Sequence, residues 1–98
     1  MKDTKRQFKI IRTIVNEWDP CSLIASGALV DEYDAITYKL LSGHANGLIA
    51  TDQKAEVIQL LDSYYGVALL QLSKQDRITL LQGIDEVLDE MKNNLTNA

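Results

Sequence analysis

Apolar side chains recur at three- and four-residue spacing along most of this 98-residue chain, which is the period of an amphipathic α-helix. The first such pattern predicts a helix from about Asp3 to Trp18. Its apolar stripe consists of Phe8, Ile11, Val15 and Trp18, widened by Ile10 and Ile14, and its opposite face carries Lys2, Lys5, Lys9 and Arg12. One face of this helix is therefore expected in the core, and the other presents a line of positive charge.

The pair Asp19-Pro20 is expected to end that helix, because Pro cannot continue a helix and forces the preceding residue out of the α region. The same pair can begin a short extra helical turn, with Asp19 as N-cap and Pro20 at the first helical position. We place this extra turn over Cys21–Ile24.

The second helix is predicted from about Glu32 to Ser42, since Asp31 and Asp34 form a weak variant of a capping box. Gly43 stands where a left-handed C-cap residue belongs. The apolar face of this helix consists of Tyr33, Ile36 and Leu40.

The third helix is expected to begin at the N-cap pair Thr51-Asp52 and to end before Gly66. The side chains it would turn toward the core are Val57, Ile58, Leu61, Tyr64 and Tyr65. The apolar run 67–72 fits a strand, a short helix or an extended connector by pattern alone. Because no partner strand is apparent, we predict a helical or extended connector.

The last helix is predicted from the capping box at Ser73–Asp76 to about Lys92. Gly83 lies inside it and weakens the helix by about 1 kcal/mol relative to Ala, which predicts the close approach of another backbone at this position. Its stripe consists of Leu80, Leu81, Ile84, Leu88 and Met91, and Leu95 could extend it. Residues 1–3 and 93–98 are expected to be frayed ends.

These elements predict an all-α fold: a small antiparallel bundle of four main helices with the short extra turn after Asp19-Pro20, forming one domain over residues 1–98. Hydrophobic residues make up 46% of the chain and charged residues 24%, as in an ordinary globular protein. The single Cys cannot form an internal disulfide, and no apolar run approaches the roughly 20 residues of a membrane span. We therefore expect a cytoplasmic protein.

Charge is distributed unevenly along the chain. Residues 1–12 carry five basic side chains against Asp3, whereas the remainder holds five basic and thirteen acidic ones. This acidic body argues against nucleic-acid binding, which requires many Lys or Arg side chains near phosphates. The short basic face of the first helix makes membrane binding a weak alternative.

No catalytic or cofactor-binding motif is apparent. Cys21 and His44 are the sole nucleophile–base pair that the sequence offers, and Asp19 next to Cys21 disfavours a thiolate. The acidic cluster lacks the alternating pattern and central glycine of a calcium loop, and helix capping accounts for several of its members: Glu17, Asp19, Asp31, Glu32 and Asp34. We predict no enzyme activity, no cofactor and no bound metal.

Two segments of the chain carry a resemblance to a known family. They are Trp18-Asp19-Pro20, which ends the first helix, and Asp31-Glu32-Tyr33-Asp34, which opens the second. Over roughly residues 8–90 the chain resembles a family of small all-helical proteins from Bacillus-like Gram-positive bacteria that is catalogued as a domain of unknown function. The resemblance implies a cytosolic helical domain and no catalytic residue. The segment before Asp31 lacks the proline that the family pattern leads one to expect.

Two classes of function remain open. The first is a non-catalytic interaction or regulatory module, for instance an immunity protein that neutralises a basic toxin. Its docking residues would be Asp85, Glu86, Asp89 and Glu90 on the last helix and Lys5, Lys9 and Arg12 on the first. The second is a small-molecule binder or weak enzyme with a pocket near Trp18 and Tyr33.

The acidic face of the last helix has three possible explanations. Like charges four residues apart are mildly destabilising, so the first helix could offset them internally, or a basic partner could do so. The face could also be solvated charge that only keeps the protein soluble. The sequence does not decide between a monomer and a homodimer.

Overall fold

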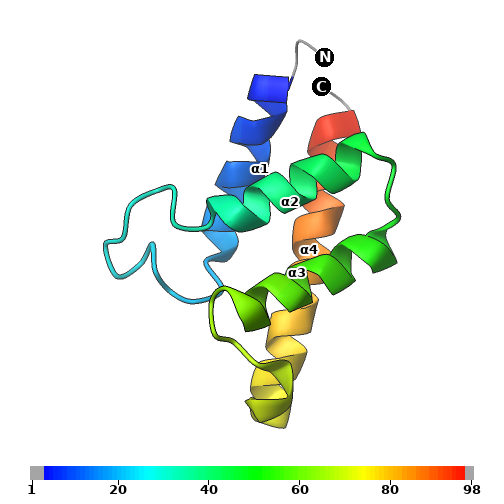
Figure 1. Cartoon of the computed structure of the whole chain (residues 1–98). Coiled ribbons are helices and arrows are strands. Elements are labelled where there is room, and N and C mark those ends of the chain that lie inside the picture. The colour runs from blue at the N-terminus through cyan, green and yellow to red at the C-terminus, as the bar shows by residue number, and fades with distance from the viewer. Residues whose placement is uncertain (1–3, 97–98) are drawn as a thin grey trace.

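The computed structural model describes the backbone of residues 4–96, so the predicted fraying of residues 1–3 and 97–98 lies outside the described residues. Four α-helices and one short 3₁₀ helix form the chain (Figure 1). They are α1 (Thr4–Trp18), α2 (Asp34–Ala45), α3 (Ala50–Ser63), η1 (Leu69–Gln71) and α4 (Lys74–Thr96). The predicted all-α fold class is confirmed.

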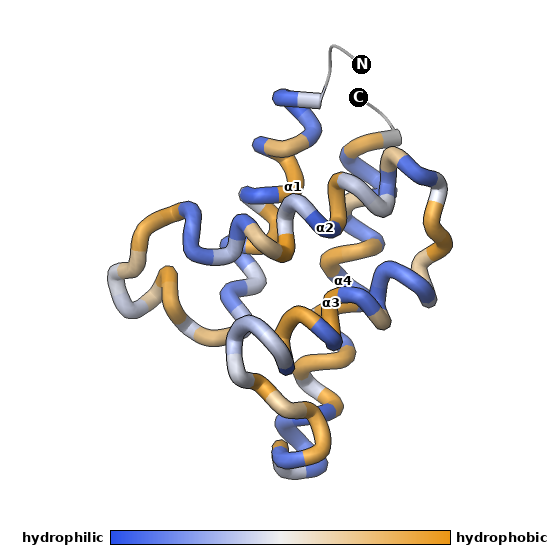
Figure 2. Tube along the Cα trace, viewed as in Figure 1, coloured by the Kyte–Doolittle hydropathy of each residue, from blue (hydrophilic) through white to orange (hydrophobic). Residues whose placement is uncertain are grey.

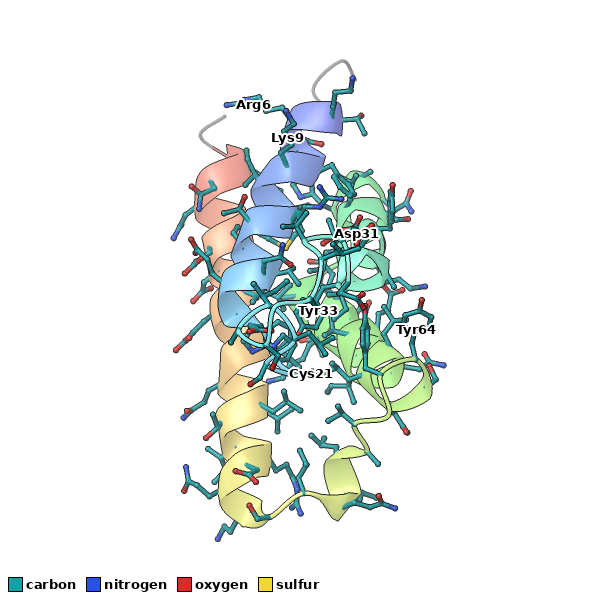
Figure 3. The ribbon with its side chains drawn as sticks, turned by 90° about the vertical axis from the view of Figure 1, so that its left-hand side faces the viewer. Arg6, Lys9, Cys21, Asp31, Tyr33 and Tyr64 are labelled. Carbon is teal, nitrogen blue, oxygen red and sulfur yellow. The ribbon has the colours of Figure 1, made fainter. Side chains whose placement is uncertain are left out.

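The helices form two antiparallel pairs. The start of α1 and the end of α4 lie at the same end of the molecule, and α2 and α3 form a hairpin that lies across this pair (Figure 1). In the view turned by 90°, α1 and α4 again lie side by side, with α2 and α3 on the other side (Figure 3). Each pair packs on the other through α1 against α2 and α3 against α4.

The core is the region where the apolar stripes of all four helices meet. The stripe positions predicted from the sequence are buried there, in particular Ile11, Val15, Ile36, Leu40, Val57, Leu61, Ile84, Leu88 and Met91. Hydrophobic stretches also lie outside the helices, in the long loop between α1 and α2 and in the connector at the foot of α4 (Figure 2). Val67 in that connector packs against the core.

Both predicted ends of α2 are wrong. Tyr33 occupies the N-cap position without a side-chain capping bond, so neither Asp31 nor Asp34 caps this helix. The helix continues through Gly43 to Ala45, and Gly43 is buried against α3, where the Gln53 Nε2 atom would lie 3.0 Å from an added Cβ. The glycine of this turn with a positive φ, 74°, is Gly47. Gly43 thus serves close packing between helices and not helix termination.

The predicted end of α4 at Lys92 is also wrong. The helix continues to Thr96, and Leu95 is only 7% exposed. This burial holds the last turn of α4 in place, which local propensity does not reveal. The start is as predicted, because the Asp76 N–H donates to the Ser73 hydroxyl at 3.1 Å. The connector between α3 and α4 is also as predicted, with η1 between extended residues.

One predicted core residue of α3 lies at the surface. Tyr64 is 67% exposed, whereas the neighbouring Tyr65 is half-buried and donates its hydroxyl to the Glu32 carbonyl at 2.8 Å. The helix ends at Ser63, so the helical period that placed both tyrosines on one face no longer applies.

Candidate functional site

A groove of about 590 Å³ lies between the end of α1, the connector before α4 and the first half of α4. We call it the Trp18 groove. Its apolar lining comes from Trp18, Pro20, Val67, Leu72 and Leu80, and its carboxylates come from Asp19, Asp76 and Glu86. Apolar walls with acidic groups among them can bind a partner that has both an apolar and a basic side chain.

The groove continues along the seam between α1 and α4. A smaller hollow of about 140 Å³ shares Trp18, Gly83 and Glu86 with it, and a further one of about 370 Å³ begins at Ile14. Carboxylates recur along this extension, at Glu17 and Glu90. Among the described residues that line these three hollows, Lys9 is the only one with a basic side chain.

Trp18 lies over Gly83 of α4, and this contact shapes the groove. A Cβ added at Gly83 would meet the indole Nε1 atom and would lie 2.9 Å from Cδ1, far closer than carbon atoms can pack. A close contact is therefore present at Gly83, but the prediction of a neighbouring backbone is wrong, because the indole side chain of Trp18 makes the contact. Trp18 itself is only half-buried, because its other side faces the groove.

Tyr33 does not line the groove, contrary to the predicted pocket near Trp18 and Tyr33. Its side chain is fully buried, with 0% exposure. The Tyr33 hydroxyl donates to Asp19 Oδ1 at 2.6 Å and accepts the backbone N–H groups of Cys21 at 2.9 Å and Leu23 at 3.3 Å. Tyr33 therefore reaches the groove only through Asp19.

Asp19 does cap a turn, but not in the way that the sequence predicts. Its φ of 48° is left-handed, whereas an N-cap residue is typically extended. Its carboxylate accepts the N–H groups of Ile24 at 3.1 Å and Ala25 at 2.9 Å, so it satisfies donors farther along the chain than a standard cap would. The extra turn after Pro20 is present as a series of hydrogen-bonded turns, including Ser26 N–H to the Ser22 carbonyl at 3.1 Å.

This hydrogen-bonded cluster determines the charge states of its members. Burial alone would raise the pKa of Asp19, but the hydrogen bonds from Tyr33, Ala25 and Ile24 outweigh it and lower that pKa. Burial raises the pKa of Tyr33, and the hydrogen bond that it donates to Asp19 raises it further. Burial likewise raises the pKa of the Cys21 thiol. At neutral pH the cluster therefore holds a carboxylate, a neutral phenol and a neutral thiol, and the thiol is a poor nucleophile.

The predicted acidic docking face of α4 is divided between two neighbouring helices. Asp85 turns toward α3, where the Lys54 Nζ atom lies 2.9 Å from its Oδ1. Glu86 and Glu90 turn toward α1 and line the seam, whereas Asp89 is exposed and lines none of the three hollows. The structure thus brings Glu86 and Glu90 to the groove and its extension and leaves Asp85 outside.

The predicted basic docking residues are also divided. Arg12 forms a bidentate salt bridge with Asp34, in which Nη2 donates to Oδ2 at 2.6 Å and Nε donates to Oδ1 at 3.0 Å. Its guanidinium carbon also lies 5.1 Å from the ring centroid of Phe8. Arg12 therefore joins α1 to α2 and offsets no charge on α4. Lys5 and Lys9 are exposed, and Figure 3 shows Lys9 near the start of α1, away from Cys21 and Tyr33.

Cys21 and His44 do not form a catalytic pair. The Cys21 backbone is bonded to Tyr33 at the start of α2, and His44 is exposed in the last turn of the same helix. At about 1.5 Å per residue, those two ends of α2 are about 16 Å apart. Among the described residues, no group of three or more His, Cys, Asp or Glu side chains is arranged to hold a metal ion.

The purified protein is expected to contain less than one equivalent of any transition metal per chain. Within residues 4–96, His44 has no neighbouring ligand set, and the carboxylates of the groove are not gathered into one coordination sphere. Elemental analysis after desalting measures this directly. One zinc or iron ion per chain would contradict the prediction and would require ligands from outside the described residues.

The sequence predicted one wall of the groove and missed the other. Trp18, Asp19 and Pro20 were identified as the segment that ends the first helix, whereas Val67, Leu72 and Leu80 were assigned to the connector and to the stripe of the last helix. The apolar run 67–72, longer than a surface connector needs, was the one available signal.

No helix within residues 4–96 is both long and apolar enough to cross a membrane. Comparison of the chain with protein-family models, with curated proteins and with solved structures finds no match.

Proposed function

We propose that this chain is a non-catalytic, cytosolic protein-interaction module that binds a basic, apolar segment of a partner protein in the Trp18 groove. The observation that carries the proposal is the combination of apolar walls with three carboxylates, Asp19, Asp76 and Glu86, in one groove. Neutralisation of a basic toxin, as by an immunity protein, is one role that suits this chemistry. Membership of the helical family of unknown function stays a prediction.

The affinity of such a complex must come mainly from the apolar part of the groove. An exposed ion pair contributes only about 0–1 kcal/mol, so the three carboxylates alone would not hold a partner. An apolar side chain that enters beside Trp18 and Leu80 would add the desolvated contact that dominates most interfaces. The carboxylates would then select for Lys or Arg next to that anchor and would speed association.

A small molecule is the second candidate occupant. A volume of about 590 Å³ lies within the range of about 300–1,000 Å³ that is usual for ligand pockets. Such a ligand would carry a positive charge, because its neighbours would be the carboxylates of Asp19, Asp76 and Glu86. Tyr33, which is buried, would not contact it.

Photo-crosslinking in the native host tests the proposal. A benzoylphenylalanine at Gln82, which lines the groove and is exposed, is expected to capture a partner protein. The control is the same crosslinking residue at Gln59, which is exposed on α3 and lies outside the groove. The crosslinked peptide of the partner is expected to contain Lys or Arg beside an apolar residue.

Charge reversal identifies the surface that is responsible. Glu86→Lys is expected to weaken capture from Gln82 about tenfold, equivalent to about 1.4 kcal/mol, because it replaces attraction by repulsion. Asp62→Lys, an equal change of charge at an exposed site on α3, is expected to have no effect. Equal amounts of crosslinked partner from Gln82 and Gln59 would contradict docking in the groove. An amount from Gln82 that Glu86→Lys does not reduce would contradict it as well. A groove that captures no protein but binds a cationic metabolite would favour the second candidate.

A further inference from the structure

We propose that Tyr33 is the positioning residue of the Trp18 groove: its buried hydroxyl holds Asp19, and Asp19 fixes the positions of Trp18 and Pro20 in the groove wall. This inference rests on the proposed function only where it concerns partner binding. Its structural half, that Tyr33 holds Trp18 and Pro20 in place through Asp19, concerns the free protein and can be right or wrong independently of the proposed function. Its functional half is that this positioning is needed for partner binding.

The turn that supplies Asp19 and Pro20 to the groove wall has left-handed backbone at two residues, of which Asp19 itself lines the groove. Asp19 and Ser22 have φ values of 48° and 57°, in the left-handed region that residues with a Cβ rarely adopt. Trp18 directly precedes Asp19, and Pro20 follows it. A relaxation of Asp19 to a negative φ would therefore change the directions in which both neighbouring side chains point.

Hydrogen bonds to one hydroxyl hold this strained turn. The Tyr33 hydroxyl donates to Asp19 Oδ1 at 2.6 Å and accepts from the N–H groups of Cys21 and Leu23. Asp19 in turn accepts from Ile24 and Ala25 N–H. The Tyr33 hydroxyl thus links Asp19, at the beginning of the turn, to Cys21 and Leu23 in its middle. Tyr33 is fully buried, so water does not replace these hydrogen bonds.

Tyr33 is itself fixed from the opposite side. It precedes the first residue of α2, and its ring lies 5.7 Å, centroid to centroid, from the ring of Tyr65 at the end of α3. The groove wall is therefore attached to the α2–α3 pair, although the rest of the groove belongs to the connector before α4 and to α4. Figure 3 shows Tyr33 and Cys21 close together, where the loop after α1 meets the start of α2.

Removal of this one oxygen would leave several polar groups without partners. In Tyr33→Phe the aromatic ring remains, but the Asp19 carboxylate loses a donor and the N–H groups of Cys21 and Leu23 lose their acceptor. Partly buried polar groups without partners are unfavourable, so the turn is expected to move toward water. The alternative is that Gly83 alone holds Trp18, in which case the groove would not change.

Quenching of tryptophan fluorescence by acrylamide in the free protein tests the structural half. Trp18 is the only tryptophan, so its emission reports on the wall alone. Tyr33→Phe is expected to increase the quenching constant of Trp18. The control is Tyr65→Phe, which removes the bond to the Glu32 carbonyl from a ring in contact with Tyr33 but leaves the turn untouched. Its quenching is expected to equal that of the parent chain.

Hydrogen exchange separates a local effect from a general loss of stability. In Tyr33→Phe the amides of Ile24 and Ala25 are expected to exchange about tenfold faster, because their acceptor Asp19 is released. The amides of Leu40 and Leu61 in the core of α2 and α3 are expected to keep their rates. Equal acceleration at all four amides, or unchanged quenching of Trp18, would overturn the positioning role.

Crosslinking from Gln82 tests the functional half. Tyr33→Phe is expected to reduce capture about tenfold, and Tyr65→Phe is expected to leave it unchanged. If Glu86→Lys abolishes capture and Tyr33→Phe does not, the positioning role is wrong and the proposed function stands. If Tyr33→Phe releases Trp18 but neither variant alters capture, the proposed function is wrong and the structural half stands.

Discussion

Trp18→Ala is expected to lower the free energy of unfolding by about 3 kcal/mol, near the lower end of the usual range for truncation of a large aromatic residue. The indole packs on Gly83 and on the core, so its removal leaves a void between α1 and α4. The half-exposed side of the ring faces the groove and contributes little, which is why the value stays below that of a fully buried Trp.

Urea titration followed by circular dichroism measures this loss without relying on the fluorescence of the residue that is removed. The control is Leu70→Ala, another large apolar side chain but 87% exposed, for which a change within about 0.5 kcal/mol is expected. An unchanged midpoint in Trp18→Ala would show that the turn after α1 does not organise this end of the fold.

Gly83→Ala is expected to destabilise the protein by about 2 kcal/mol, although Ala is the better helix former. The substitution gains about 1 kcal/mol of helix propensity. Against this gain, the added Cβ would meet Nε1 and Cδ1 of the Trp18 indole, and overpacking of this kind costs about 1–3 kcal/mol or more. The ring must therefore move into the groove, and the emission of Trp18 is expected to shift to longer wavelength.

A double-mutant cycle separates the two contributions. In a Trp18→Ala background the indole that the added Cβ would meet is absent, so Gly83→Ala is expected to become stabilising by up to about 1 kcal/mol. Gln82→Ala, at the exposed neighbouring position of α4, is expected to be nearly neutral in both backgrounds. If Gly83→Ala has the same sign with and without Trp18, the contact does not explain the glycine.

The helices themselves could be predicted from the sequence, because an amphipathic helix carries its own period. The stripes around Ile11, Ile36, Val57 and Ile84 all face the core as that period requires. Capping by Ser73 and the interruption of the chain after Trp18 are also local chemistry, since each acts within a few residues.

At two of the wrongly predicted helix ends, the C-terminal ends of α2 and α4, packing outweighs a local signal. Gly43 has the composition of a C-cap, yet α2 passes through it because Gln53 packs against the space that a side chain would fill. Polar residues at the end of α4 predict fraying, yet Leu95 is buried and the helix continues. For Gly43 the partner Gln53 lies on another helix, and for Leu95 it is burial in the core that keeps the last turn helical.

The candidate site shows the same division between local pattern and tertiary structure. The sequence by itself determined that Trp18, Asp19, Pro20 and Tyr33 are an unusual set, and that α4 carries an excess of carboxylates. Only the tertiary structure decided that the buried Tyr33 hydroxyl donates to Asp19 and that Arg12 forms a salt bridge with Asp34. It also decided that Glu86 is the one member of the four predicted α4 carboxylates that lines the main groove. The physical reason is that side-chain period assigns each residue to a face of its own helix, whereas hydrogen bonds and grooves depend on how helices are placed against one another.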